Sequence, residues 1–168
     1  LDGRSVSRIN ANLSASADVT EAQPLPENAG FSFIGPSPKA PFDIEWPVAQ
    51  EMLSMPLNPN QRPNSDVVRP VISGVDIVQG SRNKWTIDFG LMTLEDASLF
   101  EAPFEYVRKV VLPIRASRRD DYRGQWWQYA RPRPEMRKAL SGFHRFIATP
   151  RVAKHRVFVW LTSAATPN

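Results

Sequence analysis

The sequence predicts an α+β fold in which small, mixed and mainly antiparallel sheets are combined with short helices. Short apolar segments of helical and strand character follow one another, and they do not alternate regularly as they do in a doubly wound parallel sheet. Prolines and glycines end most of these segments. The chain has 168 residues, of which 42% are hydrophobic, so it can fill one hydrophobic core but hardly two. We therefore expect one domain or a piece of one.

The first 30 residues differ from the rest of the chain. They are polar and carry few periodic apolar positions, which predicts an extended arm or linker over residues 1–30 and a folded domain over residues 31–168. Position 1 is leucine rather than methionine. We take this as a sign that the chain is an excised or processed part of a longer polypeptide.

Four segments have the pattern of strands. Residues 31–35 form a short apolar segment, closed by a loop in which three prolines forbid regular pairing. Residues 84–89 alternate apolar and polar side chains, as a half-buried strand does. Two final strands are predicted at residues 144–149 and 156–161. No internal repeat relates these segments.

Proline positions and caps predict four helices. Thr93 and Asp96 have the spacing of a capping box, so a helix is expected to start there. Pro113 is expected to stop the third helix, because proline lacks the backbone N–H that an interior position donates. The predicted helices are residues 47–55, 94–102, 103–111 and 135–140.

Composition excludes several kinds of site. Cysteine is absent, which excludes disulfides, thiolate zinc sites and cysteine nucleophiles and fits a reducing compartment. The two histidines, His144 and His155, cannot make a metal centre by themselves. No apolar run approaches the roughly 18 residues of a membrane span, and no hydrophobic signal peptide opens the chain. We expect no membrane partner, no metal and a cytoplasmic location.

Charge is segregated along the chain. Residues 1–60 carry three Lys and Arg against seven Asp and Glu, and residues 61–107 carry four against seven. Residues 108–160, which we call the basic segment, carry fourteen against three, and eleven of the fourteen are arginine. The basic segment also contains three tryptophans and two tyrosines. Arginines interleaved with aromatic rings are typical of proteins that bind a polyanion, because neutralised phosphates release counterions and planar rings stack on bases. A solvated face that only keeps the domain soluble is the alternative.

The reacting groups of an enzyme are hard to find. The sequence has no glycine-rich dinucleotide motif and no Walker lysine loop. Residues 58–61 (Asn-Pro-Asn-Gln) are only weakly similar to the Asn-Pro-Pro-aromatic loop of amino-group methyltransferases, so they predict a surface turn. Asp120 and Asp121 stand beside arginines, which favours a surface pair over a metal site. We expect no catalytic, cofactor-binding or metal-binding residues within the chain.

Four stretches of the sequence carry a resemblance to a known family. They are residues 28–35, 69–77, 85–90 and 122–161. The last stretch contains three unusual strings: Trp126-Trp127, Arg131-Pro132-Arg133-Pro134, and residues 148–156 (Ala-Thr-Pro-Arg-Val-Ala-Lys-His-Arg). Together they resemble the target recognition region of adenine-specific DNA methyltransferases. Within that family the chain is most similar to the large fused type IIG restriction-modification enzymes, the group with a TaqI-like specificity domain, and to their relatives in phage defence. The resemblance covers nearly the whole chain.

The resemblance implies a division of labour. In that family a methyltransferase core precedes the recognition region, which continues beyond the final strand seen here. The chain is therefore expected to lack its core and to be shortened at its C-terminus. The core would bind S-adenosylmethionine and methylate a flipped adenine, while residues 31–168 would recognise the double-stranded DNA around it. The implied partners are double-stranded DNA and the methyltransferase core of the same polypeptide.

Eleven side chains of the basic segment are predicted to contact DNA. Long cationic side chains can reach phosphates, and an arginine in the major groove can take guanine in a bidentate pair. The tryptophans could stack on bases or wedge between them, and burial of one tryptophan under the basic layer is the alternative. Asp88 and Glu135 could accept from cytosine, but pairing with nearby arginines is the favoured interpretation. The predicted DNA-binding residues are Arg115, Arg118, Arg119, Arg123, Trp126, Trp127, Arg131, Arg133, Arg151, Lys154 and Arg156.

Two other classes of function stay open at this point. One is an RNA or single-stranded nucleic-acid binding module whose tryptophans stack on unpaired bases. The other is an interaction or inhibitory domain whose basic surface meets an acidic protein. Competition between duplex and single-stranded nucleic acid separates the first of these from duplex DNA recognition.

Overall fold

The computed structural model describes residues 25–117 and 124–167, together with positions 3, 5–7, 9, 10, 15 and 23. The chain divides into two compact units, Leu1–Phe33 and Ile34–Asn168. A short 3-10 helix, η2 (Pro26–Asn28), belongs to the first unit. Every strand and α-helix that the structure describes belongs to the second. That the residues before this division act as an arm or linker stays a prediction.

Two sheets organise the second unit. The larger has four strands in the order β1-β3-β2-β6, and it combines antiparallel pairs with one parallel pair between β2 and β6. The smaller is an antiparallel pair of β4 and β5. The strands are β1 (Asp43–Ile44), β2 (Val68–Ile72), β3 (Trp85–Ile87), β4 (Arg145–Ala148), β5 (Val159–Thr162) and β6 (Thr166–Pro167).

Helices connect these strands without regular alternation, which confirms the predicted α+β class with small, mainly antiparallel sheets. A 3-10 helix, η3 (Asn64–Asp66), precedes β2. No helix in the described part of the chain is long and apolar enough to span a membrane. The α-helices are α1 (Trp46–Leu53), α2 (Gly74–Gln79), α3 (Leu94–Ser98), α4 (Glu101–Ser117) and α5 (Pro134–Leu140).

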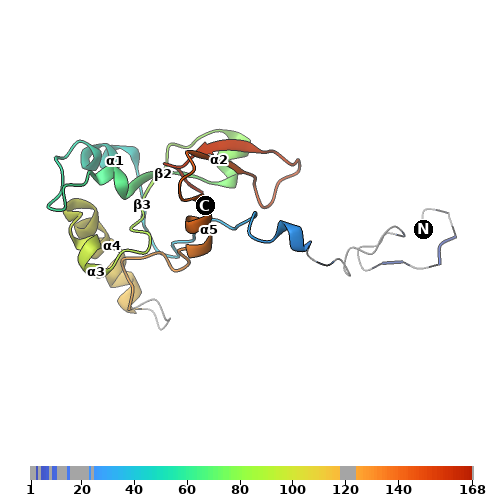
Figure 1. Cartoon of the computed structure of the whole chain (residues 1–168), viewed down its shortest axis with the longest axis horizontal. Helices are drawn as coiled ribbons and strands as arrows, with labels where there is room; N and C mark the ends of the chain where they lie inside the picture. The colour runs from blue at the N-terminus through green and yellow to red at the C-terminus, as the bar shows by residue number, and fades with distance from the viewer. Residues whose placement is uncertain are drawn as a thin grey trace. The chain divides into compact units, whose positions relative to one another are not determined.

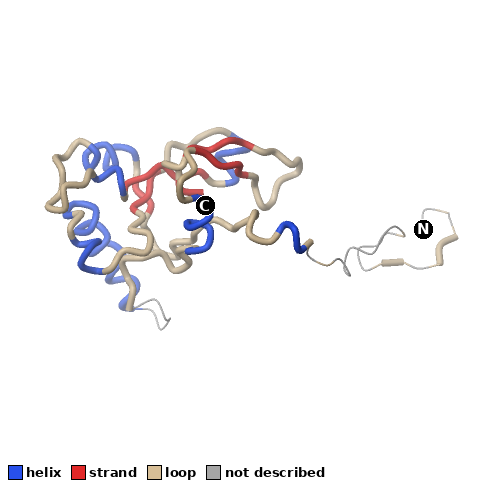
Figure 2. The backbone as a smooth tube through the Cα atoms, in the orientation of Figure 1, coloured by secondary structure: helices blue, strands red, loops and turns tan. Residues whose placement is uncertain are grey.

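The two sheets lie beside different helices. Figure 1 shows α1, α3 and α4 on one side of β2 and β3, and α2 with the β4–β5 pair on the other. In Figure 2 the β4–β5 pair is the narrow red element beside α2. We call this pair with its connecting loop, residues 145–162, the β-ribbon.

The hydrophobic core lies where α1, α3 and α4 cover the four-stranded sheet. Phe42, Ile87, Phe89 and Phe100 are its largest fully buried side chains, and full burial of each stabilises the fold by about 1.5–3 kcal/mol. Helix α4 buries positions 103, 107, 111 and 115, one every four residues. This spacing gives α4 one buried stripe toward the core, apolar except for Arg115, and leaves the opposite face to solvent.

Most predicted elements are present with shifted ends. The predicted helix at 94–102 is divided between α3 and the start of α4, because a turn follows Ser98. The predicted strand at 31–35 is wrong, since no strand is assigned there, and Ser37 instead forms an isolated bridge with Arg131. The two-residue strands β1 and β6 were not predicted from the sequence.

The predicted helix end at Pro113 is also wrong, because α4 continues to Ser117. A proline inside a helix removes one backbone hydrogen bond and costs about 3 kcal/mol. Pro113 itself is exposed, while Val111 and Arg115 on either side of it are buried. Packing of the buried stripe therefore offsets the cost of the proline and overrides the local stop signal.

Helix α2 begins at a capping box. The Ser73 hydroxyl accepts from the backbone N–H of Asp76, and the Asp76 carboxylate accepts from the backbone N–H of Ser73. The backbone N–H and guanidinium of Arg82 donate to the same carboxylate. These hydrogen bonds, led by that of the Arg82 guanidinium, hold the pKa of Asp76 well below its usual range although the side chain is buried. The carboxylate therefore stays ionised at neutral and mildly acidic pH, and the start of α2 stays fixed.

Candidate nucleic-acid interface

The β-ribbon has two faces that follow from its register. Antiparallel pairing places Arg145 opposite Thr162 and Ile147 opposite Trp160. Because side chains alternate across a strand, these four side chains share one face, and all four are exposed. The alternate positions, such as Phe146, are half-buried. The ribbon therefore packs one face against the domain and presents the other, which we call the open face, to solvent.

An arginine is held over a tryptophan on the open face. The Cζ atom of Arg145 lies 4.3 Å from the centroid of the Trp160 ring. Trp160 keeps 59% of its surface exposed and Ile147 keeps 57%. At an exposed site such a cation–π contact contributes about 0.5–1 kcal/mol. The stack restricts where the guanidinium lies without using its N–H groups as donors.

The loop between β4 and β5, residues 149–158, concentrates positive charge. Arg151, Lys154 and Arg156 are exposed, and Arg156 donates to the backbone carbonyl of Pro150 at 3.5 Å. The chain has no Asp or Glu after Glu135. The structure shows no ion pair between these three cations and any residue it describes. Their charge is thus available to an external anion.

The same loop is anchored on α2. Pro150 is buried, and a Cβ atom added at Gly74 would lie only 3.3 Å from the Cβ atom of Pro150. Gly74 is the first residue of α2, so a side chain there would crowd the loop against the helix. The capping box at Ser73 and Asp76 therefore fixes the surface on which the basic loop rests.

The structure gathers three of the predicted DNA-binding residues, Arg151, Lys154 and Arg156, on this loop. Arg131 and Arg133 lie instead on the segment before α5. Arg131 is exposed, and the Arg133 guanidinium is half-buried and donates to the carbonyl of Gly35 at 3.3 Å. Contact of these five side chains with DNA stays a prediction.

Three further predicted residues, Arg118, Arg119 and Arg123, lie outside the described residues, which resume at residue 124. Their predicted contacts with DNA stay predictions as well.

The predicted contact of Arg115 with DNA is wrong, because its side chain is buried and cannot reach a phosphate. Only 2% of the residue is exposed. Its guanidinium donates to the carbonyls of Gln125 and Pro38 at 3.0 and 2.8 Å, and its Cζ atom lies 5.3 Å from the centroid of the Phe42 ring. Helix α4 continues through Pro113, so position 115 follows position 111 on the buried stripe. Arg115 therefore ties α4 to two other segments of the domain.

The predicted contact of Trp127 with DNA bases is also wrong, because this side chain is buried. It is 8% exposed, its indole N–H donates to the Met92 carbonyl at 2.9 Å, and it belongs to the core. This is the alternative in which one tryptophan lies under the basic layer. Trp126 is half-buried and packs against Phe104, with ring centroids 5.3 Å apart. Its predicted contact with bases stays a prediction.

Asp88 pairs with an arginine, as the favoured interpretation predicted. The Arg137 guanidinium donates to both carboxylate oxygens at 2.9 and 2.8 Å, and the Asp88 side chain is 3% exposed. Arg137 also donates to the Pro132 carbonyl at 2.6 Å. Part of the basic segment is therefore structural, because Arg137 fixes α5 against the end of β3.

Residues 58–61 form a turn, as predicted, but Asn58 has a structural role that the sequence did not reveal. Asn58 is buried, and its amide group donates to the carbonyl of Arg62 and to the side chain of Asn64. Its side-chain oxygen accepts from the backbone N–H of Glu101 at 3.2 Å. Asn58 therefore caps the start of α4.

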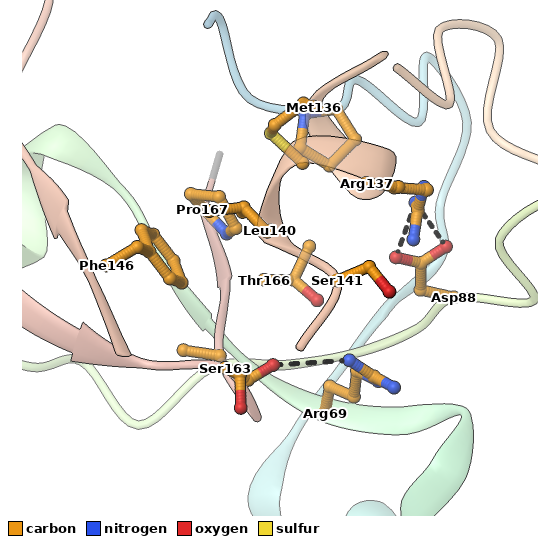
Figure 3. A pocket seen from close by; sticks show the side chains of 12 residues that line it. Arg69, Asp88, Met136, Arg137, Leu140, Ser141, Phe146, Ser163, Thr166 and Pro167 are labelled. Carbon is orange, nitrogen blue, oxygen red and sulfur yellow. Dashed lines mark hydrogen bonds and ion pairs between the residues drawn. The ribbon is translucent and has the colours of Figure 1, made fainter. Parts of the chain in front are cut away.

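A pocket of about 260 Å³ lies between α5, the base of the β-ribbon and the end of β3. Figure 3 shows Arg137 from α5 aimed at Asp88, with Phe146 on the opposite wall. Arg69 donates to the carbonyl of Ser163 at 3.4 Å across it. Among the lining residues that the structure describes, Asp88 supplies the only carboxylate, which is paired with Arg137, and none is a histidine. The lining therefore does not assemble a nucleophile with a base.

The open-face residues Arg145, Ile147 and Trp160 were missed as site residues. The predicted strands at 144–149 and 156–161 already place positions 145 and 147 on one face, so the signal was the alternation within the first of them. The sequence does not tell which face of the ribbon packs against the domain. That is decided by the packing of the opposite face, where Phe146 is half-buried.

Among the residues that the structure describes, no group of three or more His, Cys, Asp or Glu side chains could hold a metal ion. Comparisons of the chain with protein-family models, with curated proteins and with solved structures found no match.

Proposed function

We propose that the second unit recognises double-stranded DNA by placing the β-ribbon in the major groove. The B-form major groove is about 12 Å wide and admits a two-stranded ribbon, whose strands lie about 4.8 Å apart. The observation that carries the proposal is that the open face of the β-ribbon continues directly into the loop of residues 149–158, whose three cations form no ion pair with any residue that the structure describes. Side chains of the open face would meet base edges, and Arg151, Lys154 and Arg156 would meet phosphates.

The resemblance noted above supports placing this domain in an adenine-specific DNA methyltransferase of the type IIG restriction-modification or phage-defence kind. S-adenosylmethionine would then bind in a methyltransferase core outside residues 1–168, and that core would be the second partner. The chain itself would supply sequence recognition and no catalysis. A cytoplasmic location belongs to the same proposal.

RNA or single-stranded nucleic acid is the second candidate, and the exposed rings of Phe143, Phe158 and Trp160 favour it. Two observations favour duplex DNA more. Arg145 covers one face of the Trp160 ring, which reduces its use as a stacking platform. A-form RNA has a major groove too deep and narrow for side chains to read, so the ribbon matches B-form DNA better.

Competition binding on the full chain tests the class of ligand. With a fluorescent 20-base-pair duplex as probe, unlabelled duplex DNA should compete at least about tenfold better than the single strand, duplex RNA or polyglutamate. Three phosphate contacts correspond to a slope of about −2.7 in log affinity against log salt, or about a 40-fold loss between 50 and 200 mM. Better competition by the single strand or RNA would support the second candidate. Displacement by polyglutamate alone would support an acidic protein partner, and no salt dependence would contradict all nucleic-acid proposals.

A further inference from the structure

The open face of the β-ribbon holds side chains that match the major-groove edges of particular bases. Arg145 offers a planar fork of N–H donors, which fits the O6 and N7 acceptors of guanine. Ile147 offers an apolar surface, which fits the 5-methyl group of thymine. Both side chains lie on the open face and both are exposed, and no hydrogen bond or ion pair that the structure describes uses the Arg145 guanidinium.

The positions of these two side chains are fixed relative to each other. They stand two residues apart on β4, which is about 6.8 Å along a strand and close to two steps of a DNA duplex at about 3.4 Å each. Trp160 lies opposite Ile147 in the register, and its ring stacks on Arg145 and restricts the position of that guanidinium. Preorganised side chains lose less conformational entropy on binding, which favours specific contacts.

We infer that the β-ribbon selects DNA sites in which a guanine and a thymine lie within about two base pairs, with Arg145 on the guanine and Ile147 on the thymine methyl group. The inference rests on the proposed duplex recognition and adds which residues read bases. Arg151, Lys154 and Arg156 then act as phosphate contacts that do not distinguish sequences.

The full chain is first used to select duplexes from a random library, and the enriched duplex becomes the probe. Base analogues are then placed in that duplex to test the contacts. Replacement of the guanine by 7-deazaguanine, which lacks the N7 acceptor, should weaken wild-type binding about 5- to 50-fold. Replacement of the thymine by uracil should weaken it about 3-fold, since one methyl contact is lost. The Arg145→Ala variant should no longer respond to 7-deazaguanine, and the Ile147→Ala variant should no longer respond to uracil.

Two further variants serve as controls. Arg145→Lys keeps the charge but loses the planar fork, so it should retain the salt slope and lose the guanine preference. Arg151→Ala should weaken binding to all duplexes alike and still respond to both analogues.

Different experimental outcomes would contradict the inference alone or the proposed function as well. Salt-dependent duplex binding with no enriched motif, or with no response of the wild type to either analogue, would overturn base reading by Arg145 and Ile147 and leave duplex binding intact. Absence of duplex binding would overturn both.

Discussion

Replacement of Arg137 by alanine should destabilise the domain by about 3–5 kcal/mol, because it leaves the Asp88 carboxylate buried without its partner. Arg137 contributes two hydrogen bonds to Asp88 and one to the Pro132 carbonyl. A loss of this size should lower the melting temperature by roughly 10–15 °C in a domain of this length. Thermal unfolding followed by circular dichroism measures it.

A double variant checks the physical reason. Asp88→Asn with Arg137→Met removes both charges and keeps the side-chain oxygen that accepts from the backbone N–H of Gly90. It should recover most of the stability that Arg137→Ala loses, because removing a buried pair costs far less than breaking it. If the single variant unfolds at the wild-type temperature, Arg137 does not hold α5 in place.

Replacement of Arg115 by alanine should destabilise the domain by about 3–4 kcal/mol, since the carbonyls of Gln125 and Pro38 lose a charged donor and a cavity opens beside Phe42. The salt slope of DNA binding should be unchanged for the fraction that stays folded. Arg115→Lys keeps the charge without the planar fork, so it should lose part of the stability and stay folded. A slope that falls by about one unit at unchanged melting temperature would instead make Arg115 a phosphate contact.

Arg115 and Arg137 show why a sequence count of positive charge could not by itself locate a binding surface. Both belong to the arginine-rich basic segment, yet the guanidinium of each is bound by groups of the domain itself. Arg108 and Lys109 are likewise neutralised, in ion pairs with Glu105. The partner of Arg108 and Lys109 is near in sequence, but Asp88 and Pro38, which bind Arg137 and Arg115, are distant in sequence and are known only from the folded structure.

The sequence predicted the class of fold and most helices, since proline positions, caps and alternation are local signals. It failed where packing decided the outcome. Helix α4 passes Pro113 because its buried stripe outweighs the lost hydrogen bond. Trp127 lies in the core, where the Met92 carbonyl accepts from its indole N–H. The two-stranded ribbon was present in the prediction as two strands, but its open face required the packing of Phe146.

Charge removal at two places tests most directly whether the β-ribbon is the DNA-binding surface. One variant replaces Arg151, Lys154 and Arg156 by alanine, and a matched variant replaces Arg62, Arg108 and Lys109, three exposed cations outside the ribbon. Both lower the net charge by the same amount. The loop variant should flatten the salt slope of duplex binding by about 2.7 units while the matched variant leaves it nearly unchanged. Equal slopes in the two variants would mean that the ribbon loop has no special role in binding.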